Sequence, residues 1–401
     1  MKQLINIGIL LMVYIVSSHA QSYVALESLD QAVAIALEKN AGLQALSLEE
    51  ERQLRLQKTV SELDKTQFYH SFDENNIAPN DRPLRVYGVQ QNFPFPTVWG
   101  SRKRLYRLNT RLAHTQYLMG EWELKRKVSQ AYYEVIYRQN RLKQLTYLDS
   151  LYEEFQGAAT RQYASGESGY LEKIAATNYY QRIHLQRLQE EEALGLVYAK
   201  LEAALQTEDA IRVTYTPLEQ SVVPDTAMMP LTLNYVKLIE QQAQANFRLQ
   251  RQTLLPDISL EYFRGFNNGE NAQVYNGYSV GLAVPLWFVP AAHQVQAEKI
   301  RLARVEQEGR HYLRQWESQR HQLQSSLNQY YQAIQYLEES GLPSAREMQE
   351  VARKSYQLGE INYLNYIQIL ESVTHSQLEY LDNLNSYNQA FWELYYLTGL
   401  P

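Results

Sequence analysis

The spacing of apolar residues predicts a chain of long helices interrupted twice by strands. From Trp99 to Phe155 apolar residues recur at every third or fourth position, without a proline and with glycine only at Gly100, beside the start, and at Gly120. A helix of that length would reach roughly 85 Å, which no compact globule needs. Further helices are expected at about 28–63, with Ser28 or Asp30 as its N-cap, at 170–205 and at 231–254.

Two segments, about 66–93 and 257–286, instead alternate apolar and polar residues, which predicts a β-hairpin in each. The second hairpin has one apolar face, formed by Ile258, Leu260, Tyr262, Val280, Leu282 and Val284. Strands of about 10 residues with one apolar face and aromatic ends match tilted membrane-spanning strands. The other interpretation is a soluble hairpin that packs one face on helices.

Landmarks of the first half return in the second half about 190 residues later, which indicates an internal duplication. The segment 162–171 corresponds to 355–364 with Tyr, Gly, Glu and Leu in register, and the proline-containing segment 93–95 corresponds to 284–286. The chain therefore divides into three parts after its first 20 residues. These are a first repeat at 21–206, a linker at 207–230 and a second repeat at 231–401.

Composition and the N-terminus narrow the class of protein. The chain is mildly acidic, with 38 Lys and Arg against 44 Asp and Glu and no basic cluster, so we expect no nucleic acid partner. Lys2, an apolar run and small residues up to a cleavage site near Ala20 predict a secretory signal peptide at 1–20. Because the sequence has no cysteine, we expect neither a disulfide nor a lipid-bearing N-terminal cysteine.

A membrane crossing would have to use the strands. The most apolar later stretch, 278–292, is too short for a spanning helix and contains Pro285 and Pro290. One hairpin per repeat gives four strands, which cannot close a barrel, and an open edge in lipid leaves backbone groups unpaired. Three copies would supply about twelve strands, enough for a barrel with a water-filled lumen, so a homotrimer is predicted.

These features resemble the TolC family of outer-membrane efflux proteins over essentially the whole mature chain. The order of helix, hairpin, proline-containing strand end, long helix, turn and return helix occurs twice, with the pairs Tyr132-Tyr133 and Tyr330-Tyr331 and two Tyr-x-x-Gly-Glu turns as motifs. The chain is most similar to the subgroup that works with heavy-metal pumps of the resistance-nodulation-division class. That closer similarity lies in the segments 255–263, 359–368 and 380–390.

The resemblance implies a mainly α-helical fold with a membrane β part. Each of three protomers would contribute four strands to a twelve-stranded β-barrel in the lipid of the outer membrane. The helices would form a long coiled-coil barrel across the periplasm and dock onto a periplasmic adaptor and an inner-membrane pump. The implied function is the passive exit duct of a tripartite efflux pump, with heavy-metal cations as the expected substrate.

The resemblance also implies where the periplasmic entrance lies. In the family, acids six and nine residues after the second-repeat glycine constrict the entrance. Here these positions hold Asn365 and Gln368, whereas the matching first-repeat position keeps an acid, Glu172, and Tyr356 occupies the aromatic gate position. We refer to these four residues as the entrance candidates. The turn residues expected to contact the adaptor are Gly166, Glu167, Gly359 and Glu360.

No constellation for catalysis, cofactor binding or metal binding occurs in the sequence. The eight histidines include no pair three or four residues apart, and there is neither a glycine-rich phosphate loop nor a Gly-x-Ser-x-Gly motif. The run Glu190-Glu191-Glu192 is interpreted as a solvated helix face. We therefore expect no enzyme, cofactor or metal site. A drug-efflux or type I secretion channel, and a periplasmic coiled-coil scaffold or adaptor without a membrane part, remain as alternatives.

Overall fold

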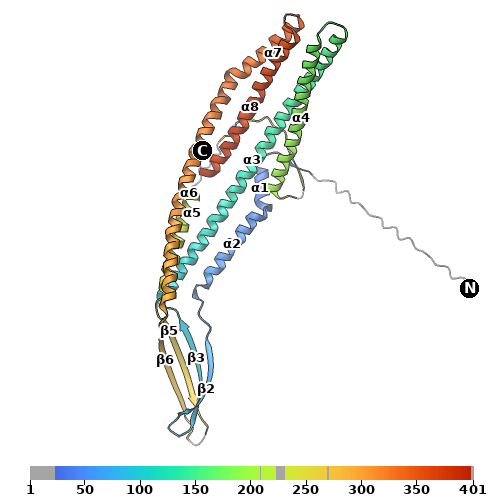
Figure 1. Ribbon diagram of the computed structural model, residues 1–401. Helices are drawn as coiled ribbons and strands as arrows, with labels where there is room; N and C mark the ends of the chain where they lie inside the picture. The colour runs from blue at the N-terminus through green and yellow to red at the C-terminus, as the bar shows by residue number, and fades with distance from the viewer. Residues whose placement is uncertain (1–22, 208, 223–230, 269–270, 399–401) are drawn as a thin grey trace, which may run out of the picture.

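The computed structural model describes residues 23–207, 209–222, 231–268 and 271–398. They form a long, narrow molecule with four strands at one end and two helical turns at the other (Figure 1). The signal peptide expected at 1–20 lies outside the described residues. Among the described helices, none combines the length and the apolar character needed to cross a membrane.

The first repeat is built on the helix α3, which runs unbroken over Pro96–Ala164 and is 69 residues long. At 1.5 Å per residue it reaches roughly 100 Å. Pro96 opens the helix, where its missing amide proton would have had no partner within the helix. The other first-repeat helices are α1 (Leu29–Lys39), α2 (Ala41–Gln57), the short 3₁₀ helix η1 (Lys58–Ser61) and α4 (Tyr170–Leu205).

The single helix expected at 28–63 is in fact two, α1 and α2. Ser28 caps α1, and its side chain accepts a hydrogen bond from the amide of Gln31. Asn40 then ends α1 and caps α2, because its backbone is extended and its Oδ1 accepts from the amide of Leu43 at 3.0 Å. An asparagine side chain competes with the helix for backbone donors, so it can break a helix without glycine or proline.

The second repeat copies this plan, but its long helix is interrupted. Its elements are α5 (Leu231–Gln252), α6 (Phe288–Tyr336), the π-helical turn η2 (Leu337–Gly341), α7 (Leu342–Gln357) and α8 (Tyr363–Thr398). The starts of the two long helices, Pro96 and Phe288, are 192 positions apart, whereas their ends, Ala164 and Gln357, are 193 apart. A π-helical turn holds one residue more than an α-helical turn, so η2 matches this one-residue difference.

The four long strands form one antiparallel sheet in the order β2-β3-β5-β6. The strands are β2 (Gln67–Ile77), β3 (Pro83–Phe93), β5 (Asp257–Phe266) and β6 (Val274–Ala283). The pairing of β3 with β5 joins the two repeats, from Arg85 opposite Phe266 to Phe93 opposite Ile258. Within the described chain, β2 and β6 are therefore the edges of this sheet.

A second sheet was not predicted. Its two parallel strands are β1 (Tyr23–Leu26) and β4 (Ala210–Val213), and β4 falls in the stretch expected to be a linker, 207–230. Leu26, Ile211 and Val213 are buried in the central core cluster with α1, α3 and α4. Strands of four residues are too short to give a readable alternation, so sequence periodicity could not find them.

The protein has no single core but a series of apolar clusters along its length. One cluster beside the strands contains Leu105 and Leu238, and a second cluster around Val128 and Leu201 lies at the middle. A third cluster lies near the turns and joins α3 and α4 to α7 and α8. Each cluster ties neighbouring helices at one level, which suits a rod more than a globule.

One row of side chains across the sheet alternates aromatic residues with glycines. Tyr69, Gly88, Phe263 and Gly277 lie opposite one another on successive strands. A Cβ added to Gly88 would lie 2.2 Å from the ring of Tyr69, and one added to Gly277 would lie 2.3 Å from the ring of Phe263. Each ring therefore covers the glycine beside it. Tyr69 also donates a hydrogen bond to Glu261 on the same face.

Candidate functional site

The two helical turns at the far end of the molecule have the same geometry (Figure 1). In each, the glycine amide donates to the carbonyl three residues earlier, and the next amide donates to the carbonyl five residues earlier, at 2.8–3.1 Å. Gly166 and Gly359 adopt φ of 77° and 75°, which a residue with a Cβ rarely does. The glutamates that follow, Glu167 and Glu360, are exposed, so the four predicted adaptor-contact residues lie at the surface of the two turns.

Tyr356 lies in a cluster of aromatic rings between α7 and α8, not free at the surface. Its ring stacks on Tyr366, with centroids 4.9 Å apart, and meets Tyr363 edge-on at 6.3 Å. Phe155 of α3 contacts both of these tyrosines. We call these four residues the tip aromatic cluster. It fixes α7 and α8 against each other and against the first-repeat hairpin.

The structure brings only part of the entrance candidates together. Burial, and then the neighbouring Tyr356, Tyr152 and Glu172, raise the pKa of Tyr363, so Glu172 lies near the tip aromatic cluster. Asn365 and Gln368 are exposed on the first turns of α8. Within the described part of the chain, no hydrogen bond joins either side chain to the other candidates. In one protomer the four residues therefore do not form a single site.

Sequence reasoning missed an ion-pair network that joins α3, α4 and α8. Glu190 is only 6% exposed, and its carboxylate pairs with Arg138 and Arg141, each at 3.1 Å. Arg141 also pairs with Asp382, which accepts a second hydrogen bond from Tyr137 at 2.7 Å. The interpretation of Glu190 as a solvated residue is therefore wrong. Its partners are far away in sequence, and the adjacent glutamates gave no sign of which one turns inward.

A second polar contact lies nearer the turns. Arg182 of α4 forms an ion pair with Glu371 of α8, and both side chains are about half exposed. Such a surface pair contributes little to stability on its own, typically about 0–1 kcal/mol. It nevertheless joins a first-repeat helix directly to a second-repeat helix.

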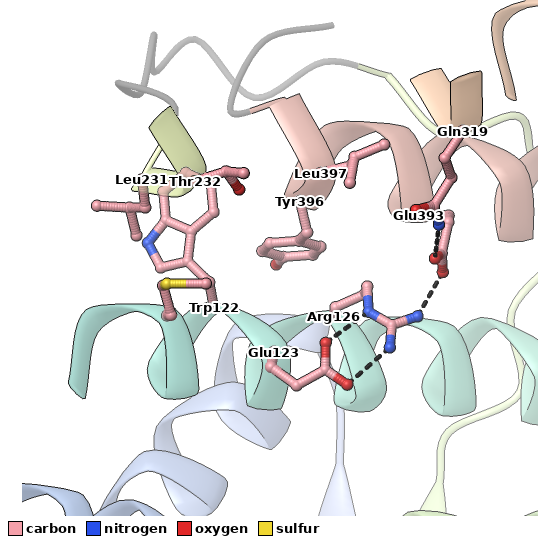
Figure 2. A pocket seen from close by; sticks show the side chains of 10 residues that line it. Trp122, Glu123, Arg126, Leu231, Thr232, Gln319, Glu393, Tyr396 and Leu397 are labelled. Carbon is pink, nitrogen blue, oxygen red and sulfur yellow. Dashed lines mark hydrogen bonds and ion pairs between the residues drawn. The ribbon is translucent and has the colours of Figure 1, made fainter. Parts of the chain in front are cut away.

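A pocket of about 410 Å³ opens at the middle of the molecule, where α3, α5, α6 and α8 meet (Figure 2). Arg126 holds Glu123 with two bonds of 2.7 and 2.9 Å and also pairs with Glu393 of α8. The hydrogen bond to Glu123 raises the pKa of Arg126. Trp122 and Tyr396 line the same pocket. Because its charges pair with one another, this pocket acts as a junction between the repeats. Among the described residues, no group of three or more His, Asp or Glu is placed to hold a metal ion.

At the other end of the molecule, the predicted apolar face of the sheet is open to its surroundings. Leu260, Tyr262, Val280 and Leu282 are exposed, and Ile258 is half-buried. Val284 is also exposed but follows the end of β6. The strand register extends the same face over β2 and β3 through Phe68, Val89 and Phe93. We call this surface the apolar sheet face. A contiguous apolar surface of this kind marks contact with a membrane or a protein.

Comparison with known proteins agrees with this architecture. Residues 231–400 match the model of the family described as outer membrane efflux protein. No curated relative matches the sequence significantly. The solved structure of CusC is similar with a TM-score of 0.74 at 15% identity, covering 92% of each chain. VceC from Vibrio cholerae gives 0.72 at 14% identity, covering 93% of this chain and 96% of its own.

The open-state MtrE channel of Neisseria gonorrhoeae gives a TM-score of 0.73 at 13% identity, covering 92% of this chain and 88% of its own. Identities this low show the fold alone, and that fold is the TolC-like one predicted from the sequence. The family match adds a similarity to outer membrane efflux proteins over residues 231–400, in the second repeat. The second repeat therefore matches the outer membrane efflux protein family, and the described chain as a whole has the TolC-like fold.

Proposed function

We propose that three copies of this chain form the exit duct of a tripartite efflux pump, in the outer membrane and across the periplasm. The observation that carries the proposal is the four-stranded sheet, which exposes the apolar sheet face and has edges at β2 and β6. In lipid each unpaired backbone group costs several kcal/mol, so this sheet is incomplete alone. Antiparallel pairing of β6 with β2 of the next copy would close about twelve strands around a lumen.

Disulfide crosslinking tests this assembly directly, because the sequence contains no cysteine of its own. Variants that carry one cysteine on β2 and one on β6 should form disulfides between copies when the two positions face each other. The detergent-purified protein should have the mass of a trimer and should conduct ions in planar bilayers. A folded protein that stays monomeric and gives no crosslinks would exclude the proposal.

We also propose that the two turns receive the periplasmic adaptor. Glu167 and Glu360 are both exposed, at equivalent positions of two turns with the same geometry. This supports the same type of contact with the adaptor at each turn. Replacing Gly359 with alanine should strain this turn, because φ there is 75°. The variant should then lose adaptor binding in pull-down assays while remaining trimeric. Gly195→Ala, inside α4, serves as a control far from the turns, because no atom apart from its own helix backbone lies within 4 Å of the added Cβ.

For the substrate, we propose heavy-metal cations supplied by a pump of the resistance-nodulation-division class. The segments 255–263, 359–368 and 380–390 support this choice through their resemblance to the heavy-metal subgroup, and Glu172 near the turns supplies negative charge. Deleting the gene should sensitise cells to metal salts such as copper or zinc. Sensitisation to organic drugs alone would favour the drug-efflux alternative, and loss of a secreted protein would favour type I secretion.

A further inference from the structure

The apolar sheet face carries positive charge at one end only. Arg264 on β5 lies opposite Tyr87 on β3, and Arg85 lies opposite Phe266 one row further from the helices. His70 on β2 belongs to the same row as Arg264. The three rows nearest the helices, which are those of Val89, Gln91 and Phe93, carry only uncharged side chains on this face of the described strands. These side chains are Phe68, Val89, Gln91, Phe93, Ile258, Leu260, Tyr262, Tyr278, Val280 and Leu282.

The two arginines flank a stacked aromatic pair. Tyr87 and Phe266 stack with centroids 5.4 Å apart and planes 1° from parallel. Tyr87 lies opposite Arg264 and Phe266 lies opposite Arg85, so the two rings are diagonal neighbours between the arginines. The guanidinium of Arg85 also lies 5.9 Å from the ring of Phe72. Within the described residues neither arginine forms an ion pair. Glu261, the carboxylate in the middle of β5, points to the opposite face and is bonded to Tyr69.

Arg85 lies near the depth of a membrane interface, and Arg264 lies one row deeper. Successive rows on one face are two residues apart, and with a strand tilt of about 40° each row adds about 5 Å along the membrane normal. Arg264 and Arg85 thus lie about 15 and 20 Å beyond the row of Ile258 and Leu282, so in an apolar band typically about 25 Å tall Arg85 is near the far edge and Arg264 is in the far half. Long arginine side chains extend further toward the headgroups. The cost of a charge falls from the midplane towards the interface, so Arg264 relies on this extension more than Arg85 does.

We propose that Arg85 and Arg264 bind the phosphate groups of anionic lipids in the leaflet farthest from the helices. A guanidinium can hold a phosphate with two parallel hydrogen bonds and is weakly hydrated, so it is suited to this interface. Tyr87 and Phe266 lie between the two arginines, where amphipathic and apolar rings belong at headgroup level. A lipid fits better than a soluble anion because the charges continue the apolar sheet face, which itself needs a hydrocarbon cover. This inference rests on the proposed function, which puts the sheet in the outer membrane.

Native mass spectrometry of the intact protein in detergent tests the inference, with phosphatidylglycerol as the probe and phosphatidylcholine of equal chain length as the neutral reference. Arg85→Gln and Arg264→Gln should each weaken phosphatidylglycerol binding about fivefold, and the double variant about 30-fold, given the usual contribution of an arginine at an anionic surface. The double lysine variant should recover part of the binding, because it restores charge without the planar fork. Arg304→Gln on α6, whose side chain is 67% exposed, is the matched control and should change nothing.

Equal phosphatidylglycerol binding by the double glutamine variant and the wild type would overturn the inference. Equal loss of phosphatidylcholine and phosphatidylglycerol would do so too, since it would indicate damage to the sheet. If the double variant fails to fold, the single variants and the lysine pair give the answer. Recovery of the wild type in the soluble periplasmic fraction would reject the proposed function and this inference together. A membrane-inserted wild type without lipid preference would reject the inference alone.

Discussion

Tyr356 stacks on Tyr366 of the same chain, with ring planes only 7° from parallel. The residue expected to act as a gate is thus anchored between α7 and α8. A ring held in this way cannot swing aside by itself, because it would leave the tip aromatic cluster. If Tyr356 narrows the entrance, the whole α7–α8 hairpin has to move with it when the passage widens.

Tyr356→Ala should therefore loosen the turn as well as widen the entrance. Loss of the stacked ring should lower the free energy of unfolding by about 1–2 kcal/mol, because the side chain is only half-buried. Single-channel conductance should rise in the same variant. Tyr356→Phe keeps the ring and should resemble the wild type in both measurements. A conductance unchanged by the alanine variant would remove Tyr356 from the constriction.

The charge of the entrance gives a second prediction. In a trimer, Glu172 of each copy would form a ring of three carboxylates that favours cations. Asn365→Asp combined with Gln368→Glu should raise cation selectivity, measured as the reversal potential in a salt gradient. The effect should be largest at low salt, where screening is weak. Unchanged selectivity in this variant and in Glu172→Gln would place the constriction elsewhere.

The strands should tolerate charge in a depth-dependent way. Tyr278 lies in the middle row of the apolar sheet face and is 82% exposed, so Tyr278→Arg should cost roughly 2–4 kcal/mol in the membrane. Leu282 lies in the row nearest the helices, and Leu282→Arg should cost less than about 1 kcal/mol. Ser279→Asn, on the opposite face, should be tolerated. Outer-membrane yield of the folded protein ranks the three variants, and equal yields would show that the faces are wrongly assigned.

Removing the buried carboxylate of Glu190 should destabilise the helices. Glu190→Gln removes one negative charge that balances Arg138 and Arg141. Both arginines are partly exposed, however, and each keeps another acidic partner. We therefore expect a loss of roughly 2 kcal/mol in urea unfolding, below the 3–5 kcal/mol typical of a fully buried pair. Glu191→Gln is the adjacent control, with 60% of its side chain exposed, and should cost less than about 1 kcal/mol.

Alkaline pH should weaken the region near the turns. Burial raises the pKa of Tyr152 to about 12, and its hydrogen bond with Thr374 offsets part of that rise. The unfolded value is about 10, so the folded state favours the neutral phenol; this stabilisation is complete below pH 10 and is lost as the pH rises towards 12. The unfolding temperature should fall between pH 10 and 12. Tyr152→Phe should flatten that fall, although it also loses the bond to Thr374. An identical pH profile in the wild type and in Tyr152→Phe would show that ionisation of Tyr152 does not cause the loss of stability.

Much of the fold could be predicted because its signals are periodic and repeated. The helices are long and rarely interrupted, so their spacing is readable, and the two glycine turns confirm each other through the duplication. The break at Asn40, the short strands β1 and β4 and the π turn leave no such signal, because each depends on a local hydrogen bond or a single added residue. The contacts of Tyr356 and Glu190 depend on side chains from other helices, which a linear pattern does not show.

The row of Tyr69, Gly88, Phe263 and Gly277 constrains how this sheet can evolve. A side chain gained at Gly88 would need the space that the ring of Tyr69 occupies, and the same holds for Gly277 and Phe263. A single replacement at either glycine creates a clash, and replacing only the ring leaves bare backbone on that face. Substitutions at these four positions should therefore become fixed in pairs, so that homologous sequences exchange ring and glycine together or keep both.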